Sequence, residues 1–180
     1  MVRALPVLLA LAVAGCGGEP AERSAAPAAP TPSAEYPVAY AVARSDVRAL
    51  ARTQLPDALE RAEVVAKSEW EPYVLLVLME WLHEHRIDLD PPADLDAAAS
   101  AMGDSWDASV VVIAAEHRRR YERRLSRLRP DRAELRDFSN EFNADDSPEA
   151  GRAMADWLDI VKRATQLADD RRVVVIPISD

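Results

Sequence analysis

The chain has 180 residues, with 31 acidic side chains against 22 from Lys and Arg, and a formal net charge of −9 at pH 7. This surplus of carboxylates argues against general nucleic-acid binding, because such proteins neutralise phosphates with Lys and Arg. The single cysteine excludes a disulfide within the chain. The sequence holds five glycines and no GxSxG, P-loop or Rossmann pattern, so the common hydrolase and nucleotide-binding motifs are excluded too.

The first residues have the form of a signal peptide. Arg3 is followed by an apolar run over residues 4–14, which is too short to cross a bilayer of about 30 Å. Small residues at 13–15 then precede Cys16. This order resembles the lipobox of bacterial lipoproteins. The resemblance implies cleavage before Cys16, a diacylglyceryl group on its sulfur and a further acyl chain on its new amine.

Acylation at Cys16 predicts a lipid-anchored protein of the bacterial cell envelope, since two or more acyl chains make membrane attachment stable. Gly17 follows the cysteine, where an aspartate would favour the inner membrane. We therefore expect the outer membrane, with the domain in the periplasm or at the cell surface. Residues 1–15 are predicted to be the signal peptide, 16–36 the lipidated cysteine and a Pro- and Ala-rich stalk, and 37–180 a single globular domain.

Apolar periodicity and capping residues predict the elements of this domain in chain order. Strands are expected at 38–42, at 110–114 (where a helix start is the alternative) and at 173–178. Helices are expected at 46–53, 57–66, 73–85, 94–102, 116–128, 131–142 and from Ser147-Pro148 to about 168. Ser45 and Pro56 are expected to begin the first two helices, Gly103 to end the fourth, and Pro177 to place its end of the last strand at a sheet edge.

The predicted fold class is α+β, predominantly helical, with a few short strands that include a C-terminal one. The stretches KSEWEPYVLLVLMEWL and DWLDIVKRATQLADDRRVVVIPI place a tryptophan before a buried helix, and an amphipathic helix before a final apolar strand. With the strand and helix that precede them, they resemble the YfbM-like family of bacterial α+β domains of unknown function. The resemblance implies an α+β fold and assigns no active site. Trp157, in the apolar stripe of the longest helix, and Trp70, ahead of the most apolar one, are expected in the core.

Glu80, His83 and Glu84 share one face of the helix predicted over 73–85, and an ExxH pair on a helix can supply metal ligands. A carboxylate di-metal site in a helical bundle needs two such pairs, and the chain has one. Asp145 and Asp146 follow Asn143 without the pattern of an EF-hand. We therefore expect a solvated helix end and an acidic capping loop, with no metal, no cofactor and no catalytic residue assigned.

Eight arginines lie between residues 118 and 132. At helical spacing, a buried stripe of His117, Tyr121, Leu125 and Leu128 leaves the arginines facing outward. The predicted surface consists of Arg118, Arg119, Arg120, Arg123, Arg124 and Arg127. Carboxylates elsewhere in this acidic domain are expected to cover these side chains. If the arginines are uncovered, they form a candidate binding surface for lipid phosphates or an acidic partner.

The function expected from the sequence is that of a membrane-anchored envelope lipoprotein that acts by binding another protein and is not an enzyme. Its expected partners are the membrane, through the lipid on Cys16, and a protein of unspecified identity, but not nucleic acid. Two alternatives stay open. One is an immunity lipoprotein that neutralises a toxin, and the other is an enzyme whose active-site residues are dispersed along the sequence.

Overall fold

The computed structural model describes residues 35–178, which lie in one compact unit. The predicted signal peptide, Cys16 and the stalk up to residue 34 lie outside the described residues. No helix within the described range combines the length and the apolar character that a membrane crossing requires.

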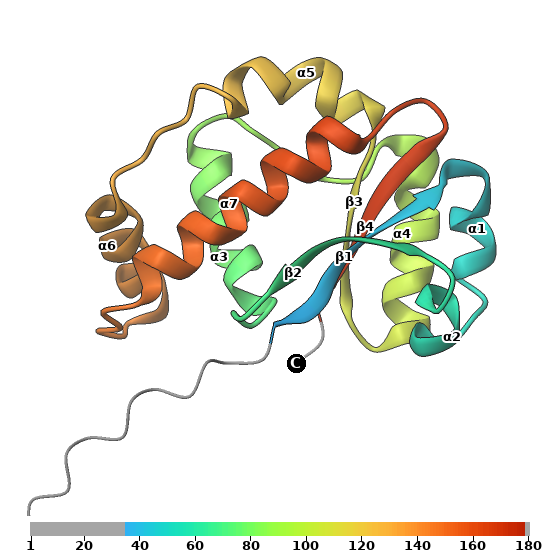
Figure 1. Ribbon diagram of the computed structural model, residues 1–180, viewed down its shortest axis with the longest axis horizontal. Coiled ribbons are helices and arrows are strands. Elements are labelled where there is room, and N and C mark those ends of the chain that lie inside the picture. Colours follow the sequence, from blue (N-terminus) through green and yellow to red (C-terminus); the bar gives the residue numbers. More distant parts are fainter. Residues whose placement is uncertain (1–34, 179–180) are drawn as a thin grey trace, which may run out of the picture. The chain divides into compact units, whose positions relative to one another are not determined.

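The described chain is an α+β domain, mostly helical, built on one four-stranded antiparallel sheet (Figure 1). The strands are β1 (Tyr36–Ala43), β2 (Glu63–Ser68), β3 (Ser109–Ile113) and β4 (Arg172–Ile178), in the order β2-β1-β4-β3. The C-terminal strand β4 therefore lies between β1 and β3.

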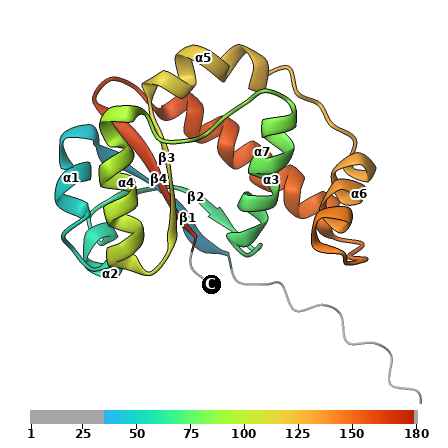
Figure 2. The same cartoon turned by 180° about the vertical axis from the view of Figure 1, so that it is seen from behind.

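Seven α-helices surround this sheet in the described part of the chain. They are α1 (Val47–Leu50), α2 (Leu55–Leu59), α3 (Tyr73–Glu84), α4 (Ala93–Trp106), α5 (Ala115–Leu125), α6 (Arg132–Asn143) and α7 (Ala150–Leu167). Figures 1 and 2 show α1, α2 and α4 on one face of the sheet, with α3, α5, α6 and α7 on the other.

Both faces of the sheet are covered because successive side chains of a strand point to opposite sides. In β4, Val174 and Ile176 belong to the core under α3, α5 and α7, whereas Val173 and Val175 belong to the core under α1 and α4. All four are fully buried, which explains why the strand is continuously apolar. Burying each such side chain stabilises the fold by about 1.5–3 kcal/mol.

The helix predicted over 57–66 is wrong beyond Leu59. Residues 63–68 form β2, an edge strand that pairs with β1, for example Val64 with Tyr40. The β-branched pair Val64 and Val65 suits an extended strand, and the pairing with β1 decides between strand and helix. Pro56 does lie in the first turn of α2, as predicted.

Several predicted helix boundaries also differ from the structure; for example, α5 ends at Leu125 and not at residue 128. Gly103 does not end α4, which continues to Trp106 and ends where Asp107 adopts a left-handed φ of 50°. Ser45 does not cap α1: it lies in a 3₁₀ turn over Arg44–Asp46, and its hydroxyl donates to the side chain of Asp46.

The sheet opens at the end where β4 finishes. Pairing of β1 with β4 stops at Tyr40 and Val175, while β4 continues beside β3, with Pro177 opposite Val110. Register shifts interrupt β1 between Pro37 and Ala39 and again before Tyr40. The end of β4 at Pro177 is therefore a sheet edge on the side of β1, as predicted. Proline has no backbone N–H, so its position past the end of the β1 pairing removes no hydrogen bond to that strand.

Of the two tryptophans expected in the core, Trp157 is fully buried, as predicted. Trp70 is half-buried at the edge of the same core, so that prediction is wrong in part. Its Nε1 donates to Asp156 Oδ2 at 2.8 Å, and the guanidinium of Arg152 lies 5.3 Å from its ring centre. Arg152 also pairs with Glu69, so these contacts join the segment between β2 and α3 to α7.

Candidate binding surfaces

Helix α5 begins at a buried histidine. The backbone N–H of Ala114 donates to Nδ1 of His117 at 3.0 Å, and Nε2 lies 2.9 Å from the carbonyl oxygen of Asp90. Because Nδ1 accepts the first bond, Nε2 carries the proton that it donates to Asp90. Burial lowers the pKa of His117, which favours this neutral form. The ring thereby fixes the N-terminus of α5 against the segment before α4.

The predicted apolar stripe of α5 is confirmed. His117, Tyr121 and Leu125 are buried, and Leu128, just past the helix, is half-buried against the same core. The arginines between them consequently face outward. Arg118 is half-exposed, and the other five members of the predicted surface are exposed: Arg119, Arg120, Arg123, Arg124 and Arg127.

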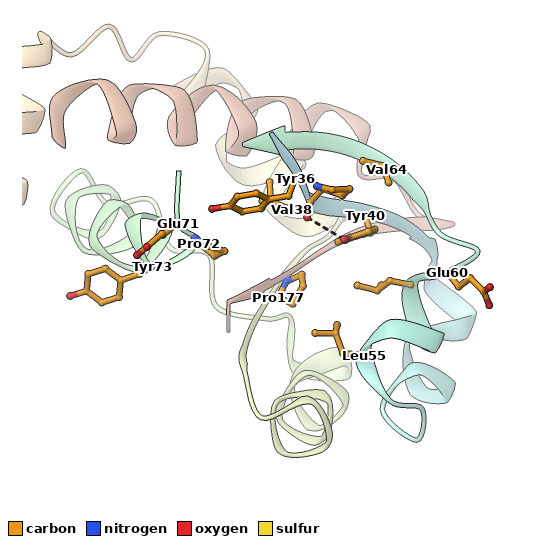
Figure 3. A pocket seen from close by; sticks show the side chains of 12 residues that line it. Tyr36, Val38, Tyr40, Leu55, Glu60, Val64, Glu71, Pro72, Tyr73 and Pro177 are labelled. Atoms are coloured by element: carbon orange, nitrogen blue, oxygen red, sulfur yellow. Dashed lines mark hydrogen bonds between the residues drawn. The ribbon is translucent and has the colours of Figure 1, made fainter. Parts of the chain in front are cut away.

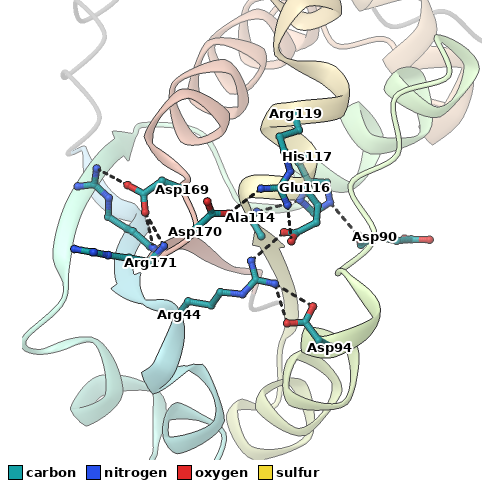
Figure 4. A network of polar contacts seen from close by, with 11 residues as sticks. Arg44, Asp90, Asp94, Ala114, Glu116, His117, Arg119, Asp169, Asp170 and Arg171 are labelled. Atoms are coloured by element: carbon teal, nitrogen blue, oxygen red, sulfur yellow. Dashed lines mark hydrogen bonds and ion pairs between the residues drawn. The ribbon is translucent and has the colours of Figure 1, made fainter.

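Carboxylates cover the first turn of this surface, as expected. Arg118 Nε lies 3.4 Å from Glu122 Oε2. Arg119 bridges two acids, at 3.0 Å to Glu116 Oε1 and 2.8 Å to Asp170 Oδ1. Figure 4 shows this contact in a larger network in which Arg44 joins Glu116 to Asp94.

The remaining four arginines are not covered, and for them the expectation is wrong. Within residues 35–178, no carboxylate forms an ion pair with Arg120, Arg123, Arg124 or Arg127. Together with Leu128 these side chains line one hollow of about 360 Å³, named here the arginine hollow. Arg124 donates to the backbone carbonyl of Arg86 at 2.6 Å, which fixes its side chain at the border of the hollow.

A larger cleft of about 850 Å³ lies at the open end of the sheet, where β1 separates from β4 (Figure 3). Its walls come from β1, α2, β2, the start of α3 and the end of β4. Sequence reasoning missed this cleft because residues 63–66 were predicted to be helical. The adjacent valines of β2 and the tyrosines at 36 and 40 were the available signals.

The other candidate residues are exposed. Glu80 and His83 border a small hollow of about 180 Å³ beside Asp88 and Asp90, and Glu84 is exposed at the end of α3. In the part of the chain that the structure describes, no group of three or more His, Cys, Asp or Glu side chains is placed to hold a metal ion. Asp145 and Asp146 are exposed in the turn between α6 and α7.

Comparison with protein-family models, with curated protein sequences and with solved structures gives no match to this chain. The resemblances to bacterial lipoproteins and to the YfbM-like family therefore stay predictions. The function has to be argued from the two surfaces just described.

Proposed function

We propose that this protein is a lipid-anchored, non-catalytic binding protein of the bacterial cell envelope, and that the arginine hollow on α5 binds an acidic segment of a partner protein. One observation carries the proposal. Arg120, Arg123, Arg124 and Arg127 border a single hollow without a paired carboxylate in the described residues, although the chain holds 31 acidic side chains. Guanidinium groups bind carboxylates through short, paired hydrogen bonds, so the hollow suits Asp and Glu side chains.

Helix α5 lies at one end of the described domain. It crosses the end of the sheet opposite to the start of β1 (Figure 1). A stalk of about 20 residues spans at most roughly 70 Å when extended, which gives the domain reach toward a partner. An immunity lipoprotein would be one form of this proposal, with the toxin as the acidic partner.

The binding test uses the full chain in detergent micelles and a fluorescent peptide rich in Glu, with a Gln-rich peptide of equal length as reference. We expect Arg120→Gln, Arg123→Gln and Arg127→Gln together to weaken binding of the acidic peptide about tenfold or more, because three charge-assisted contacts are lost. The matched control removes three exposed arginines elsewhere, Arg48→Gln, Arg52→Gln and Arg61→Gln. Equal weakening in both triple variants would mean a general charge effect and would contradict a site on α5.

Anionic and neutral vesicles form the second arm of this experiment. Stronger binding to anionic vesicles than to the acidic peptide, lost in the α5 variant alone, would identify lipid phosphates as the ligand and overturn the protein partner. The anchor is tested separately with Cys16→Ser, which should abolish incorporation of labelled palmitate and release the protein from the membrane fraction. Unchanged membrane partitioning of that variant would contradict lipidation at Cys16.

A further inference from the structure

The cleft at the open end of the sheet gathers the exposed apolar side chains of the domain. Among the described residues, four large hydrophobic side chains are exposed: Tyr36, Val64, Tyr73 and Phe142. The first three line the cleft. Phe142 directly precedes Asn143 in the chain. The hydroxyl of Tyr73 donates to Oδ1 of Asn143 at 2.9 Å. Such a concentration of exposed apolar surface marks an interaction site.

The charge of the cleft has one sign. Its lining contains two glutamates, Glu60 after α2 and Glu71 before α3, and no Lys, Arg or His. Neither glutamate forms an ion pair with any described residue. Figure 3 places them on opposite sides of the cleft, with the rings of Tyr36 and Tyr40 between them. Carboxylates and the faces of aromatic rings both attract cations.

The backbone at the cleft favours an extended ligand. β4 has β3 on one side over residues 176–178 but no described strand on its other side, since its pairing with β1 ends at Val175. An extended segment can lie along such an unpaired edge. Pro177 is the β4 residue that lines the cleft and has no N–H to donate, so the pockets for the segment's side chains carry most of the recognition.

We propose that this cleft is a second binding site, which takes an extended cationic segment of a partner protein. Apolar side chains of the segment would fill the space between Tyr40, Leu55 and Pro177, and flanking Lys or Arg side chains would pair with Glu60 and Glu71. The segment is opposite in charge to the acidic ligand proposed for the arginine hollow. The two sites are therefore tested independently.

Charge distinguishes this occupant from two others. The protein's own stalk over residues 16–36 offers Arg23 against Glu19, Glu22 and Glu35, so its net charge has the same sign as the cleft. A second copy of this chain carries a net charge of −9 and would be repelled unless it presented its arginine hollow, whose lining includes one apolar residue, Leu128. A cationic, apolar segment of another protein matches both properties of the cleft.

The test measures binding of a fluorescent peptide of alternating Lys and Leu to the full chain in detergent micelles, with peptides of Glu and Leu or of Gln and Leu as references. We expect only the cationic peptide to bind the cleft, whereas the peptide of Glu and Leu should bind at the arginine hollow and lose that binding in the variant Arg120→Gln, Arg123→Gln, Arg127→Gln. The double variant Glu60→Gln, Glu71→Gln should lower the affinity for the cationic peptide about tenfold, since two charge-assisted contacts are lost. A matched double variant at exposed acids outside the cleft, Asp104→Asn with Glu141→Gln, should bind as the unchanged protein does.

The apolar part of the site is tested with Val64→Thr, which keeps the β-branched shape of a strand residue and adds a hydroxyl to the cleft wall. Val64→Thr should also weaken binding of the cationic peptide to the cleft. It should not alter binding of the acidic peptide to the arginine hollow. Equal affinity for all three Leu-containing peptides, or no effect of either cleft variant, would overturn the proposal. A tenfold gain in affinity after deletion of residues 20–32 would identify the stalk as the occupant. Sedimentation as a dimer that Glu60→Gln, Glu71→Gln dissociates would identify a second copy.

Discussion

Nη1 of Arg44 donates a hydrogen bond to Oε2 of Glu116 at 3.0 Å, although 72 positions separate the two residues in the chain. Nη2 of the same guanidinium binds both carboxylate oxygens of Asp94, at 3.0 and 2.8 Å. Asp94 and Glu116 lie in the first turns of α4 and α5, where carboxylates also favour the positive end of the helix dipole. Arg44 thus joins the end of β1 to the N-termini of α4 and α5.

Arg44→Met should lower the free energy of unfolding by about 1–2 kcal/mol, because Met keeps the apolar stem and removes the charge-assisted hydrogen bonds. The side chain of Arg44 is 20% exposed, but those of Asp94 and Glu116 are 58% and 40% exposed, so solvent screens part of the interaction and the loss should lie toward the lower end of that range. Urea denaturation of both proteins at neutral pH measures the difference. Arg48→Met, at an exposed arginine of α1, is the matched control and should stay within about 0.5 kcal/mol of wild type.

The same contacts predict a pH dependence. The hydrogen bond from Arg44 lowers the pKa of Asp94 below 3.8. Burial alone would raise the pKa of Glu116, but the bond from Arg44 and neighbouring groups lowers it below 4.5. A carboxylate with a lowered folded-state pKa contributes stability above its unfolded pKa and loses it as pH falls through the folded value. The difference in the free energy of unfolding between wild type and Arg44→Met should therefore become smaller below about pH 4. A difference that does not change with pH would contradict the ionic origin of the effect.

Gly151 lets α7 approach α6 closely. A Cβ built on it would overlap the carbonyl oxygen of Arg132, which is backbone and cannot rotate away. Alanine is the better helix former by about 1 kcal/mol, but here the clash should dominate and make Gly151→Ala destabilising by about 1–3 kcal/mol. Gly103→Ala in α4 is the control, since its Cβ would meet Ala108 O at 3.0 Å and the helix gain should offset that contact. Thermal denaturation of both variants measures their stability. A Gly151→Ala variant as stable as wild type would mean that α6 and α7 can move apart without loss of stability.

The elements that the sequence predicts well are those whose pattern is local. β4 follows from an apolar run, α7 from apolar residues at helical spacing, and the outward arginines of α5 from the stripe that His117, Tyr121 and Leu125 define. β2 is different, because six residues with two valines suit either state until β1 pairs with them. The cleft depends on β2 and therefore could not be predicted.

Which arginines of the predicted surface pair with carboxylates also depends on residues that are distant in the sequence. Arg119 is covered because Asp170 follows α7 and reaches it from 51 positions away. Arg123 and Arg127 resemble it in sequence, but no described carboxylate is folded against them. Spacing within the helix predicts which side chains face outward, whereas coverage depends on which distant loop the fold brings near.

The two tryptophans should differ in their contribution to stability. Trp157 is fully buried, so Trp157→Ala should lower the free energy of unfolding by about 3–5 kcal/mol. Trp70 is half-buried and makes one hydrogen bond and one cation–π contact, so Trp70→Ala should cost about 1–2 kcal/mol. Chemical denaturation of both variants tests this order. Equal losses would show that Trp70 belongs to the core as fully as Trp157 does.

The last prediction concerns the buried histidine at the start of α5. Burial lowers the pKa of His117 below its ordinary value of 6.5, while backbone contacts with Asp90 and Ala114 and nearby carboxylates act in the opposite direction. The unfolded chain therefore binds a proton at a higher pH than the folded domain does. The resulting stability is complete above pH 6.5 and is lost as pH falls toward and through the folded-state pKa.

Protonation would also place a proton on Nδ1, which accepts the N–H of Ala114, so the N-terminus of α5 should loosen first. The protection factors of the first amides of α5, which correct for the intrinsic pH dependence of hydrogen exchange, should fall below about pH 6.5, ahead of those in the β4 core. His117→Asn keeps an acceptor for Ala114 and removes the titrating ring, so it should abolish this loss of protection while lowering stability at neutral pH by about 1–2 kcal/mol. His83→Asn, at an exposed position on α3, is the control and should leave the profile unchanged. Persistence of the loss of protection in His117→Asn would assign it to another group.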